Sequence, residues 1–244
     1  MTQNIYDTPD FFAGYSALPR SVHGLDGAPE WPALRAMLPT LDGARVLDLG
    51  CGFGWYARWM RGEGAASVLG IDVSENMLAR AAEMTQDPAI TYRRDDLESA
   101  ELGEGAFDLA FSVLALHYIV DLAGLLARIH RALAPGGRLV VHMEHPIFMA
   151  PSRPDFAKDG KGRRVWPLDR YLVEGPRTTD WLAPGVVKQH RRLSTTLNLV
   201  IEAGFTISRV EEWRPTDAEV AADPRRAVEL DRPMFLFFSA SKNG

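Results

Sequence analysis

The sequence contains only one cysteine, Cys51, among its 244 residues. A single thiol cannot form an intramolecular disulfide or a cysteine-rich zinc site, so we expect neither a covalent staple nor a metal centre. So little cysteine suits a protein of the reducing cytoplasm. We expect the Cys51 side chain to fill a small buried space rather than to act as a nucleophile.

Long apolar runs and excess positive charge are also missing. No run approaches the ~18 apolar residues of a membrane span, and residues 1–7 lack the basic and apolar stretches of a signal peptide. The formal net charge is −5, which disfavours nucleic acid and anionic membranes as partners. We therefore expect a cytoplasmic protein that binds neither DNA nor membranes. The sequence carries no signal for an oligomeric state.

Short apolar segments do occur, and they alternate with helical patterns. Buried-strand patterns cover residues 44–49, 67–72, 89–93, 107–113 and 138–143. Helical patterns between and after them cover residues 55–61, 74–81, 122–129 and 194–202. Two last strands are expected at 205–210 and 234–239, and a turn is expected at 135–137. This alternation predicts a parallel sheet of about seven strands with right-handed crossovers.

Two regions break the alternation. Residues 1–43 are polar and aromatic, which predicts short helices and turns. Residues 145–192 are rich in proline, glycine, aromatic and charged residues, and so long a connection is usually functional. We expect one domain with a cap at 1–43, a cofactor-binding core at 44–144, a substrate lid at 145–192, and a final helix and strand pair at 193–244.

The most informative segment is a glycine-rich loop after the first strand. Gly50, Gly52 and Gly54 follow Asp48 and open the next helix. Glycine lets a ligand approach the main chain, and a helix start offers free N–H groups and a positive dipole end. Asp72 ends the second strand, where a carboxylate can accept hydrogen bonds from both hydroxyls of a ribose. The loop therefore predicts a nucleotide-like ligand rather than a bare tight turn.

The glycine spacing separates the ligand classes. Dinucleotide-binding loops read G-x-G-x-x-G, whereas this loop reads G-x-G-x-G and places Trp55 where the third dinucleotide glycine would be. A bulky indole there would obstruct the close packing of helix on strand. The Gly-Lys-Ser/Thr ending of a Walker loop is absent. A NAD-dependent oxidoreductase on a similar sheet is therefore the weaker alternative.

The ordered motifs resemble those of the class I S-adenosylmethionine-dependent methyltransferases. The shared segments are the glycine loop with Asp72, the acidic run 95–98, the fourth strand and its turn at 107–118, and the turn at 133–137. The resemblance extends to the small-molecule branch that includes quinone-biosynthesis methyltransferases, and the first forty residues resemble the leaders of uncharacterised bacterial members.

This resemblance implies a Rossmann-like α/β fold. Its sheet would have seven mostly parallel strands, helices on both faces, an antiparallel last strand and a lid insertion between strand five and the last helix. The implied activity is methyl transfer from S-adenosylmethionine to a small-molecule acceptor. A protein that binds S-adenosylmethionine without catalysis is a second alternative, because no base is identified by the motifs alone.

The resemblance also implies roles for residues around the glycine loop. The methionine part of the cofactor would pass over Gly50, Cys51 and Gly52, and Asp48 would order the loop. Asp72 would bind the ribose hydroxyls.

Further implied contacts surround the adenine ring, which would lie against Val73 and Met77. Asp96, or its neighbour Asp95, would accept a hydrogen bond from the adenine amino group, and Leu97 would donate its backbone N–H to the ring.

The charged end of the cofactor would meet residues from other segments. The backbone carbonyl near Ser112 would accept from the ammonium group, and Arg20 would pair with the carboxylate. Tyr15 and Trp55 are candidates to face the sulfonium, because a cation over an aromatic ring is attracted by about 0.5–2 kcal/mol.

Methyl transfer is a direct displacement, so the enzyme mainly aligns the acceptor and excludes water. A base is needed only when the acceptor must lose a proton. The candidates follow strands four and five or precede the last helix: His117, Tyr118, His142, Glu144, His145 and His190. Because ligands bind beyond the carboxyl ends of strands, His145 is favoured over His142, which lies inside the strand. We take His145, His190, Tyr118 and His117 as the catalytic candidates.

Residues 145–192 should build the acceptor site. They include Trp166, Tyr171 and Trp181, and residues 151–192 contain ten Lys or Arg against five Asp or Glu. This composition predicts an anionic or aromatic small molecule, or only a solvated basic surface. Residues 112–115 read Ser-Val-Leu-Ala rather than the Asn/Asp-Pro-Pro-aromatic motif of DNA amino-methyltransferases, so methylation of DNA bases is not expected.

Overall fold

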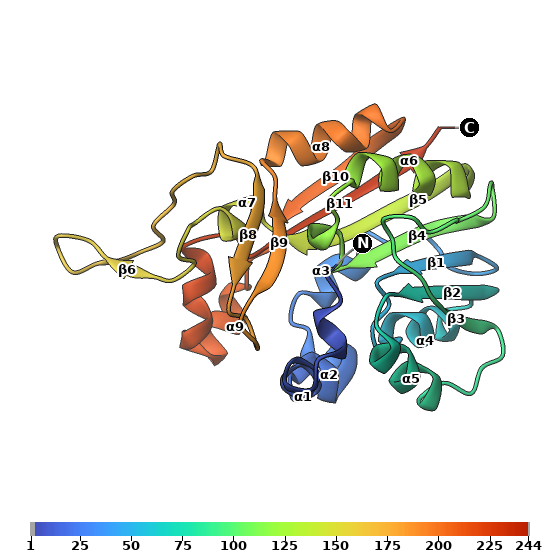
Figure 1. The fold of residues 1–244 in the computed structure, drawn as a ribbon, viewed down its shortest axis with the longest axis horizontal. Coiled ribbons are helices and arrows are strands. Elements are labelled where there is room, and N and C mark those ends of the chain that lie inside the picture. The colour runs from blue at the N-terminus through green and yellow to red at the C-terminus, as the bar shows by residue number, and fades with distance from the viewer. Residues whose placement is uncertain (1–2, 244) are drawn as a thin grey trace.

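The computed structural model describes residues 3–243, which fold around one central sheet (Figure 1). Its seven strands lie in the order β10-β11-β5-β4-β1-β2-β3. Their bounds are β1 Arg45–Leu49, β2 Ser67–Asp72, β3 Ile90–Arg94, β4 Phe107–Val113, β5 Leu133–Glu144, β10 Phe205–Glu212 and β11 Phe235–Lys242. Strand β11 runs antiparallel to both of its neighbours, and the other neighbouring pairs are parallel. The predicted Rossmann-like sheet with an antiparallel last strand is therefore confirmed.

Helices cover both faces of the sheet because each presents one apolar stripe to it. On one face lie α6 (Leu122–Ala132) and α8 (Leu193–Glu202), whose buried side chains join one apolar cluster with β4 and β5. On the other face lie α3 (Trp31–Arg35) and α4 (Trp55–Gly62), which join a second cluster. Helix α5 (Glu75–Glu83) begins after Ser74, whose side chain accepts from the Met77 N–H as an N-cap, as predicted.

One predicted turn lies inside a strand. Strand β5 begins at Leu133, so residues 135–137 form a bulge rather than a turn before it. Pairing with β4 is interrupted between Phe107 and Leu109, and Gly136 has a φ of +77°. The Pro-Gly-Gly sequence therefore bends the strand without ending it, since pairing resumes at Arg138.

The region before β1 is a leader of short helices, as predicted. We use "leader" for residues 3–43. It contains η1 Ile5–Asp7, α1 Pro9–Ser16, α2 Pro19–His23, η2 Gly24–Gly27 and α3. Three of these helices have a proline in the first turn, where a missing N–H costs nothing.

Residues 145–192, called the insertion, form two small hairpins that periodicity did not predict. After α7 (Pro146–Met149) come β6 Ala157–Lys158 with β7 Arg164–Val165, and β8 Gly175–Thr179 with β9 Val186–His190. In β9 every second residue is buried, but those positions include Lys188 and His190, so hydrophobicity alone hides the alternation. The C-terminal part adds α9 Asp217–Ala222 and η4 Pro224–Leu230, and a further short turn, η3 Leu116–Tyr118, follows β4.

The leader lies between the β8–β9 hairpin and the α4–α5 side of the sheet (Figure 1). Gln3 donates through Nε2 to the Gly185 carbonyl and accepts from the Val187 N–H, both at 2.9 Å. Ile5, Phe11 and Val186 form a small apolar cluster there. Two segments that lie 182 residues apart in the sequence are thus joined. Among residues 3–243, no helix combines the length and apolarity needed to cross a bilayer.

Candidate active site

A cavity of about 1040 Å³ lies at the carboxyl ends of β1, β2, β4 and β5. The leader and the insertion cover it. Its loop side carries Gly50, Gly52, Asp72, Val73, Met77, Asp96 and Leu97. Its insertion side carries His117, Tyr118, Glu144, Phe148, Met149, Thr179, Trp181 and Lys188. Tyr15 and Arg20 reach it from the leader.

Backbone geometry explains the glycine loop. Gly50, Gly52 and Gly54 all have positive φ, at +77°, +50° and +68°. A Cβ at Gly50 would lie 2.3 Å from the Cβ of Ala115, so β1 and the turn after β4 pack too closely for a side chain. At Gly52 only the Tyr15 hydroxyl comes within 4.0 Å of such a Cβ, so that backbone faces open cavity.

Asp72 is held against the glycine loop. Its Oδ2 accepts from the Gly52 N–H and its Oδ1 from the Ser74 N–H, each at 2.9 Å. Burial raises the pKa of the Asp72 carboxyl, and these backbone donors oppose the rise. The side chain is therefore oriented by the main chain, while it still lines the cavity.

Asp48 lies beneath the loop and does not line the cavity. It is buried, and burial together with the nearby Asp72 raises its pKa to about 7. Its Oδ2 has no hydrogen-bond partner among the described residues. Cys51 is also buried, as expected, and burial raises the pKa of its thiol well above the ordinary value. A thiol held neutral in this way is no nucleophile.

The structure distinguishes between the two acids after β3. Asp96 lines the cavity, whereas Asp95 pairs with Arg93 at 3.3 Å and does not. Ser112 is buried between strands, where its Oγ donates to the Leu49 carbonyl at 2.9 Å. The cavity wall at the end of β4 is instead formed by residues 113–115.

Arg20 and Trp55, both expected near the cofactor, have different surroundings. Arg20 lines the cavity and pairs with Glu30 at 2.8 Å, and Glu30 is only 1% exposed. Trp55 does not line the cavity; its ring faces Gly24, and the Arg58 guanidinium lies 4.8 Å from the ring centre. The suggestion that Trp55 faces a sulfonium therefore has no geometric support, because the indole packs against Gly24 and does not line the cavity.

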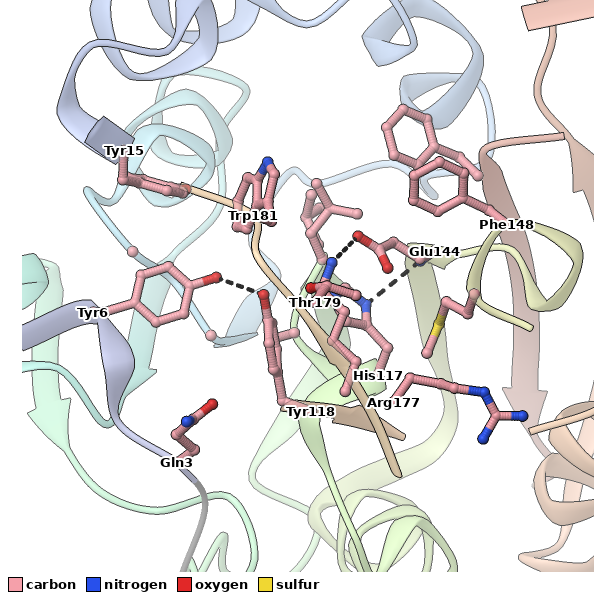
Figure 2. Close-up of a pocket in the computed structure, with 18 of the residues that line it drawn as sticks. Gln3, Tyr6, Tyr15, His117, Tyr118, Glu144, Phe148, Arg177, Thr179 and Trp181 are labelled. Carbon is pink, nitrogen blue, oxygen red and sulfur yellow. Dashed lines mark hydrogen bonds and ion pairs between the residues drawn. The ribbon is translucent and has the colours of Figure 1, made fainter. Parts of the chain in front are cut away.

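Tyrosines from the leader and from η3 lie close together in the cavity wall (Figure 2). Tyr6, which the sequence did not single out, donates to the Tyr118 hydroxyl at 3.1 Å. Burial raises the pKa of both phenols, so both stay neutral. Asp7 fastens this part of the leader to α5, because it accepts from the Ser74 hydroxyl at 2.5 Å and from the Asn76 N–H at 3.0 Å.

An ion pair occupies the insertion side. Lys188 Nζ contacts Glu144 Oε1 and lies 5.1 Å from the centre of the Trp181 ring. The Glu144 N–H donates to His117 Nδ1 at 3.4 Å (Figure 2). Burial and Lys188 lower the pKa of His117 well below its ordinary value, so the ring is neutral and carries its proton on Nε2. His117 can therefore donate from Nε2 but cannot act as a base through Nδ1.

The other two catalytic candidates lie outside the cavity. His145 Nδ1 accepts from the Ile147 N–H and caps α7, while its Nε2 lies 2.8 Å from Glu212 Oε1. His190 Nε2 lies 2.8 Å from the Tyr171 carbonyl. His145 joins the insertion to β10 and His190 joins two parts of the insertion, so their predicted catalytic roles have no geometric support. The prediction considered only which residues follow the ends of strands. It could not foresee in which direction the insertion would point their side chains.

Several lining residues escaped the sequence analysis. Tyr6, Thr179 and Lys188 carry no motif, and Glu144 was only one of several possible bases. No local pattern signalled the ion pair, because the alternation of residues 186–190 is hidden by Lys188 and His190 at its buried positions. Among residues 3–243, no group of three or more His, Cys, Asp and Glu side chains is placed to hold a metal ion.

Comparisons with known proteins agree with this geometry. Residues 47–141 match a family model described as a methyltransferase domain. The crystal structure of an S-adenosylmethionine-dependent methyltransferase from Mesorhizobium loti is 60% identical, with a TM-score of 0.86 over 90% of this chain and 100% of that one. An uncharacterized protein of Haemophilus influenzae is 34% identical over 98% of this chain and 97% of its own length.

A curated enzyme of named substrate matches over a shorter stretch. The trans-aconitate 2-methyltransferase of Deinococcus radiodurans is 38% identical over 51% of this chain and 48% of its own length. This chain thus aligns with about half of that relative. The family match decides against the oxidoreductase alternative, in keeping with the G-x-G-x-G spacing. The chain belongs to the S-adenosylmethionine-dependent methyltransferases.

Proposed function

We propose that this methyltransferase acts on a small molecule that binds beside S-adenosylmethionine in the same cavity. The observation that carries the proposal is the covered cavity of about 1040 Å³, slightly larger than the roughly 300–1,000 Å³ typical of small-ligand sites. Space of this size suits a cofactor and a small acceptor together. The trans-aconitate enzyme is a relative whose name also specifies a small acceptor.

The loop side fits the cofactor. Asp72, fixed by two backbone donors, would bind the ribose hydroxyls, and the open backbone at Gly52 would lie under the methionine part. Asp96 and Leu97 would bind the adenine, with Val73 and Met77 against the ring. When bound, S-adenosylmethionine supplies an electrophilic methyl group on a sulfonium.

The remaining lining residues complete this assignment. The Tyr15 ring would face the sulfonium, and Arg20 would bind the methionine carboxylate with the guanidinium donors that Glu30 leaves unused. Val113 and its neighbours at the end of β4 would take the place expected of Ser112. We further propose that the chain is one cytoplasmic domain, with the leader as its cap and the insertion as its substrate lid.

Titration calorimetry with S-adenosylhomocysteine tests the cofactor assignment. We expect Asp72→Ala to weaken binding by about 100-fold, since two charge-assisted hydrogen bonds to the ribose would be lost. Asp217→Ala, an exposed substitution far from the cavity, is the matched control and should bind normally. Equal affinity of the Asp72 variant and the unmodified protein would contradict the assignment.

Labelled S-adenosylmethionine tests the size of the acceptor. The enzyme is incubated with a cell extract separated by ultrafiltration into small molecules and macromolecules. We expect label to enter only the small-molecule fraction. Label in protein or RNA would contradict the proposal, and binding of S-adenosylmethionine without transfer to either fraction would favour a non-catalytic binding protein.

A further inference from the structure

The charges on the insertion side of the cavity balance. Three cations and three anions line it: Arg153, Arg177, Lys188, Glu144, Asp155 and Asp180. Among the described lining residues, no buried cation lacks a partner. Lys188 is the buried one of the three cations, and it is paired with Glu144. Arg177 is half-buried and donates to the backbone carbonyls of residues 150, 170, 173 and 176, and Arg153 is exposed to solvent. An anionic acceptor would therefore meet no buried cation free to neutralise it.

The basic charge of the insertion is used elsewhere. Arg163 pairs with Asp159 at 2.7 Å, Arg164 with Asp231 at 2.8 Å, and Arg192 with Glu174 at 3.1 Å. None of these residues lines the cavity. The excess of lysine and arginine in residues 151–192 therefore does not converge on the acceptor site, which removes the main argument for an anionic acceptor.

The walls of the insertion side are apolar and aromatic. Phe148, Met149 and Trp181 line it from the insertion, and Met234 and Phe235 from the start of β11. Flat apolar walls of this kind favour an aromatic or otherwise apolar skeleton. The Thr179 hydroxyl, whose Oγ1 is buried and has no hydrogen-bond partner among residues 3–243, adds a neutral polar contact.

Glu144 is the one anion set deep on this side. Its Oε1 accepts from Lys188, its Oε2 has no partner among the described residues, and its side chain is 14% exposed to the cavity. Glu144 is the last residue of β5 and lies beside the end of β4, since Val113 of β4 pairs with His142. The turn that follows β4 carries Ala115, which packs against Gly50 of the glycine loop. The carboxylate therefore borders the space next to the glycine loop.

We propose, building on the proposed function, that the acceptor is an uncharged aromatic molecule with a hydroxyl group and that Glu144 takes the hydroxyl proton. The acceptor oxygen forms a bond to the methyl carbon, and the carbon–sulfur bond breaks with its electron pair moving to sulfur. The O–H proton passes to Glu144 Oε2 and then to water. The products are a methyl ether and S-adenosylhomocysteine, so atoms and charge balance. Lys188 is a positioning residue that holds the carboxylate.

Charge distinguishes this acceptor from its nearest competitors. A carboxylate acceptor, such as the one in the name of the trans-aconitate enzyme, would add an unpaired anion to a neutral site. An aliphatic amine would arrive as an ammonium and add an unpaired cation. A neutral hydroxyl adds no charge and can donate to Glu144.

Three probes with one skeleton test the class: naphthol, naphthoate and naphthylmethylamine. Each is titrated into protein saturated with S-adenosylhomocysteine. We expect naphthol to bind at least about tenfold more tightly than either ion, because each ion adds an unpaired charge to the cavity. Tighter binding of naphthoate or of the amine, or no binding of naphthol, would overturn the proposal. Failure of S-adenosylhomocysteine itself to bind would instead contradict the proposed function.

Charge-changing variants sharpen the test. In Glu144→Gln the lysine loses its counter-charge, so affinity for naphthoate should rise by about tenfold while naphthol binds as before. The double variant Glu144→Gln/Lys188→Met restores neutrality and should return naphthoate to weak binding. It also keeps the test possible if the single variant fails to fold. Unchanged affinity for naphthoate in Glu144→Gln, or naphthoate binding that stays tight in the double variant, would contradict the charge argument.

Methyl transfer to naphthol tests the role of Glu144 as a base. We expect both variants to lose about 10²–10⁴-fold in kcat with unchanged affinity for S-adenosylhomocysteine. Glu212→Gln, which removes a carboxylate outside the cavity, is the matched control and should keep full activity. Full activity of the double variant, or naphthol bound but not methylated by the unmodified enzyme, would overturn the assignment.

Discussion

The loop side and the insertion side of the cavity are built in different ways. The loop side uses short segments that follow strands directly: the glycine loop after β1, Asp72 at the end of β2 and Asp96 after β3. The insertion side depends on contacts between distant segments, such as Gln3 with Gly185 and Lys188 with Glu144. The comparison teaches that the sheet fixes where a cofactor can bind, while the covering segments decide which acceptor can join it.

The two sides also differ in charge. On the loop side, burial and the nearby Asp72 carboxylate raise the pKa of Asp48 to about 7. On the insertion side, Glu144 and Lys188 neutralise each other. We therefore expect the pH dependence of stability to come from the loop side and the specificity for acceptor charge from the insertion side.

The largest expected effect is at the glycine loop. Gly50→Ala should lower the free energy of unfolding by about 4 kcal/mol, because it adds a left-handed strain and a contact with Ala115 at once. Gly136→Ala is a matched control, since it has the same φ of +77° with open space around it. It should cost only about 1–2 kcal/mol. Urea denaturation measures both, and equal losses would contradict the packing argument.

The second expected effect is a pH dependence of stability that comes from Asp48 on the loop side. Burial raises the pKa of Asp48 from 3.8 to about 7. The folded state is therefore most stable, with respect to this group, below pH 4, where Asp48 is protonated, and that stability is lost as the pH rises through 7. Asp48→Asn should therefore raise the free energy of unfolding at pH 8 by on the order of 3 kcal/mol and have little effect at pH 4.

Asp108 provides the opposite control for this pH experiment. Its hydrogen bond from Arg45 lowers the pKa of the Asp108 carboxyl, so the stabilisation is present at neutral pH and lost in acid. Asp108→Asn should therefore lose stability at pH 8. Denaturant midpoints at the two pH values measure both variants, and a gain for Asp48→Asn that is equal at pH 4 and pH 8 would contradict the account.

The third effect concerns the ion pair of the insertion side. Lys188→Met leaves Glu144 without its counter-charge and should cost about 2 kcal/mol, somewhat less than a fully buried pair because Glu144 reaches the cavity. Arg214→Met breaks an exposed ion pair with Asp217 and should cost no more than about 0.5 kcal/mol. Thermal unfolding compares the two variants. Equal small shifts would mean that the ion pair is effectively solvated.

The smallest expected effect concerns the contact between the leader and the start of α5. Asp7→Ala removes hydrogen bonds to the start of α5 and should cost about 1 kcal/mol, as for other lost caps. It should also speed proteolysis within the leader, because this part of the chain opens more often. Asp10→Ala, exposed on α1, should leave both properties unchanged. Cleavage of the two variants at the same rate would contradict the claim that Asp7 holds the leader against α5.

Sequence reasoning succeeded where structure is local. The strand at 107–113, the Ser74 cap and the glycine loop each follow from neighbouring residues, and the observed elements match them. Of the two acids after β3, the family resemblance named Asp96 first and Asp95 as its alternative, and Asp96 is the one that lines the cavity. Asp72 could also be placed, because it ends a strand beside the loop.

Sequence reasoning failed where side chains meet across long separations. The pairing of Lys188 with Glu144 depends on how the β8–β9 hairpin folds back over β5, which no local pattern encodes. His145 lies one residue beyond a strand end, yet it caps α7 and does not enter the cavity. The position of a residue along a strand therefore predicts at which edge of the sheet the residue lies. It does not predict the direction of a side chain that follows the strand.

Co-crystallisation with S-adenosylhomocysteine and naphthol tests the central claim most directly, since it locates both ligands in one measurement. We predict the ribose at Asp72, the adenine at Asp96 and Leu97, and the naphthol hydroxyl within hydrogen-bond distance of Glu144 Oε2 on the insertion side. A complex with S-adenosylhomocysteine away from the glycine loop, or with naphthol outside the cavity, would contradict the account.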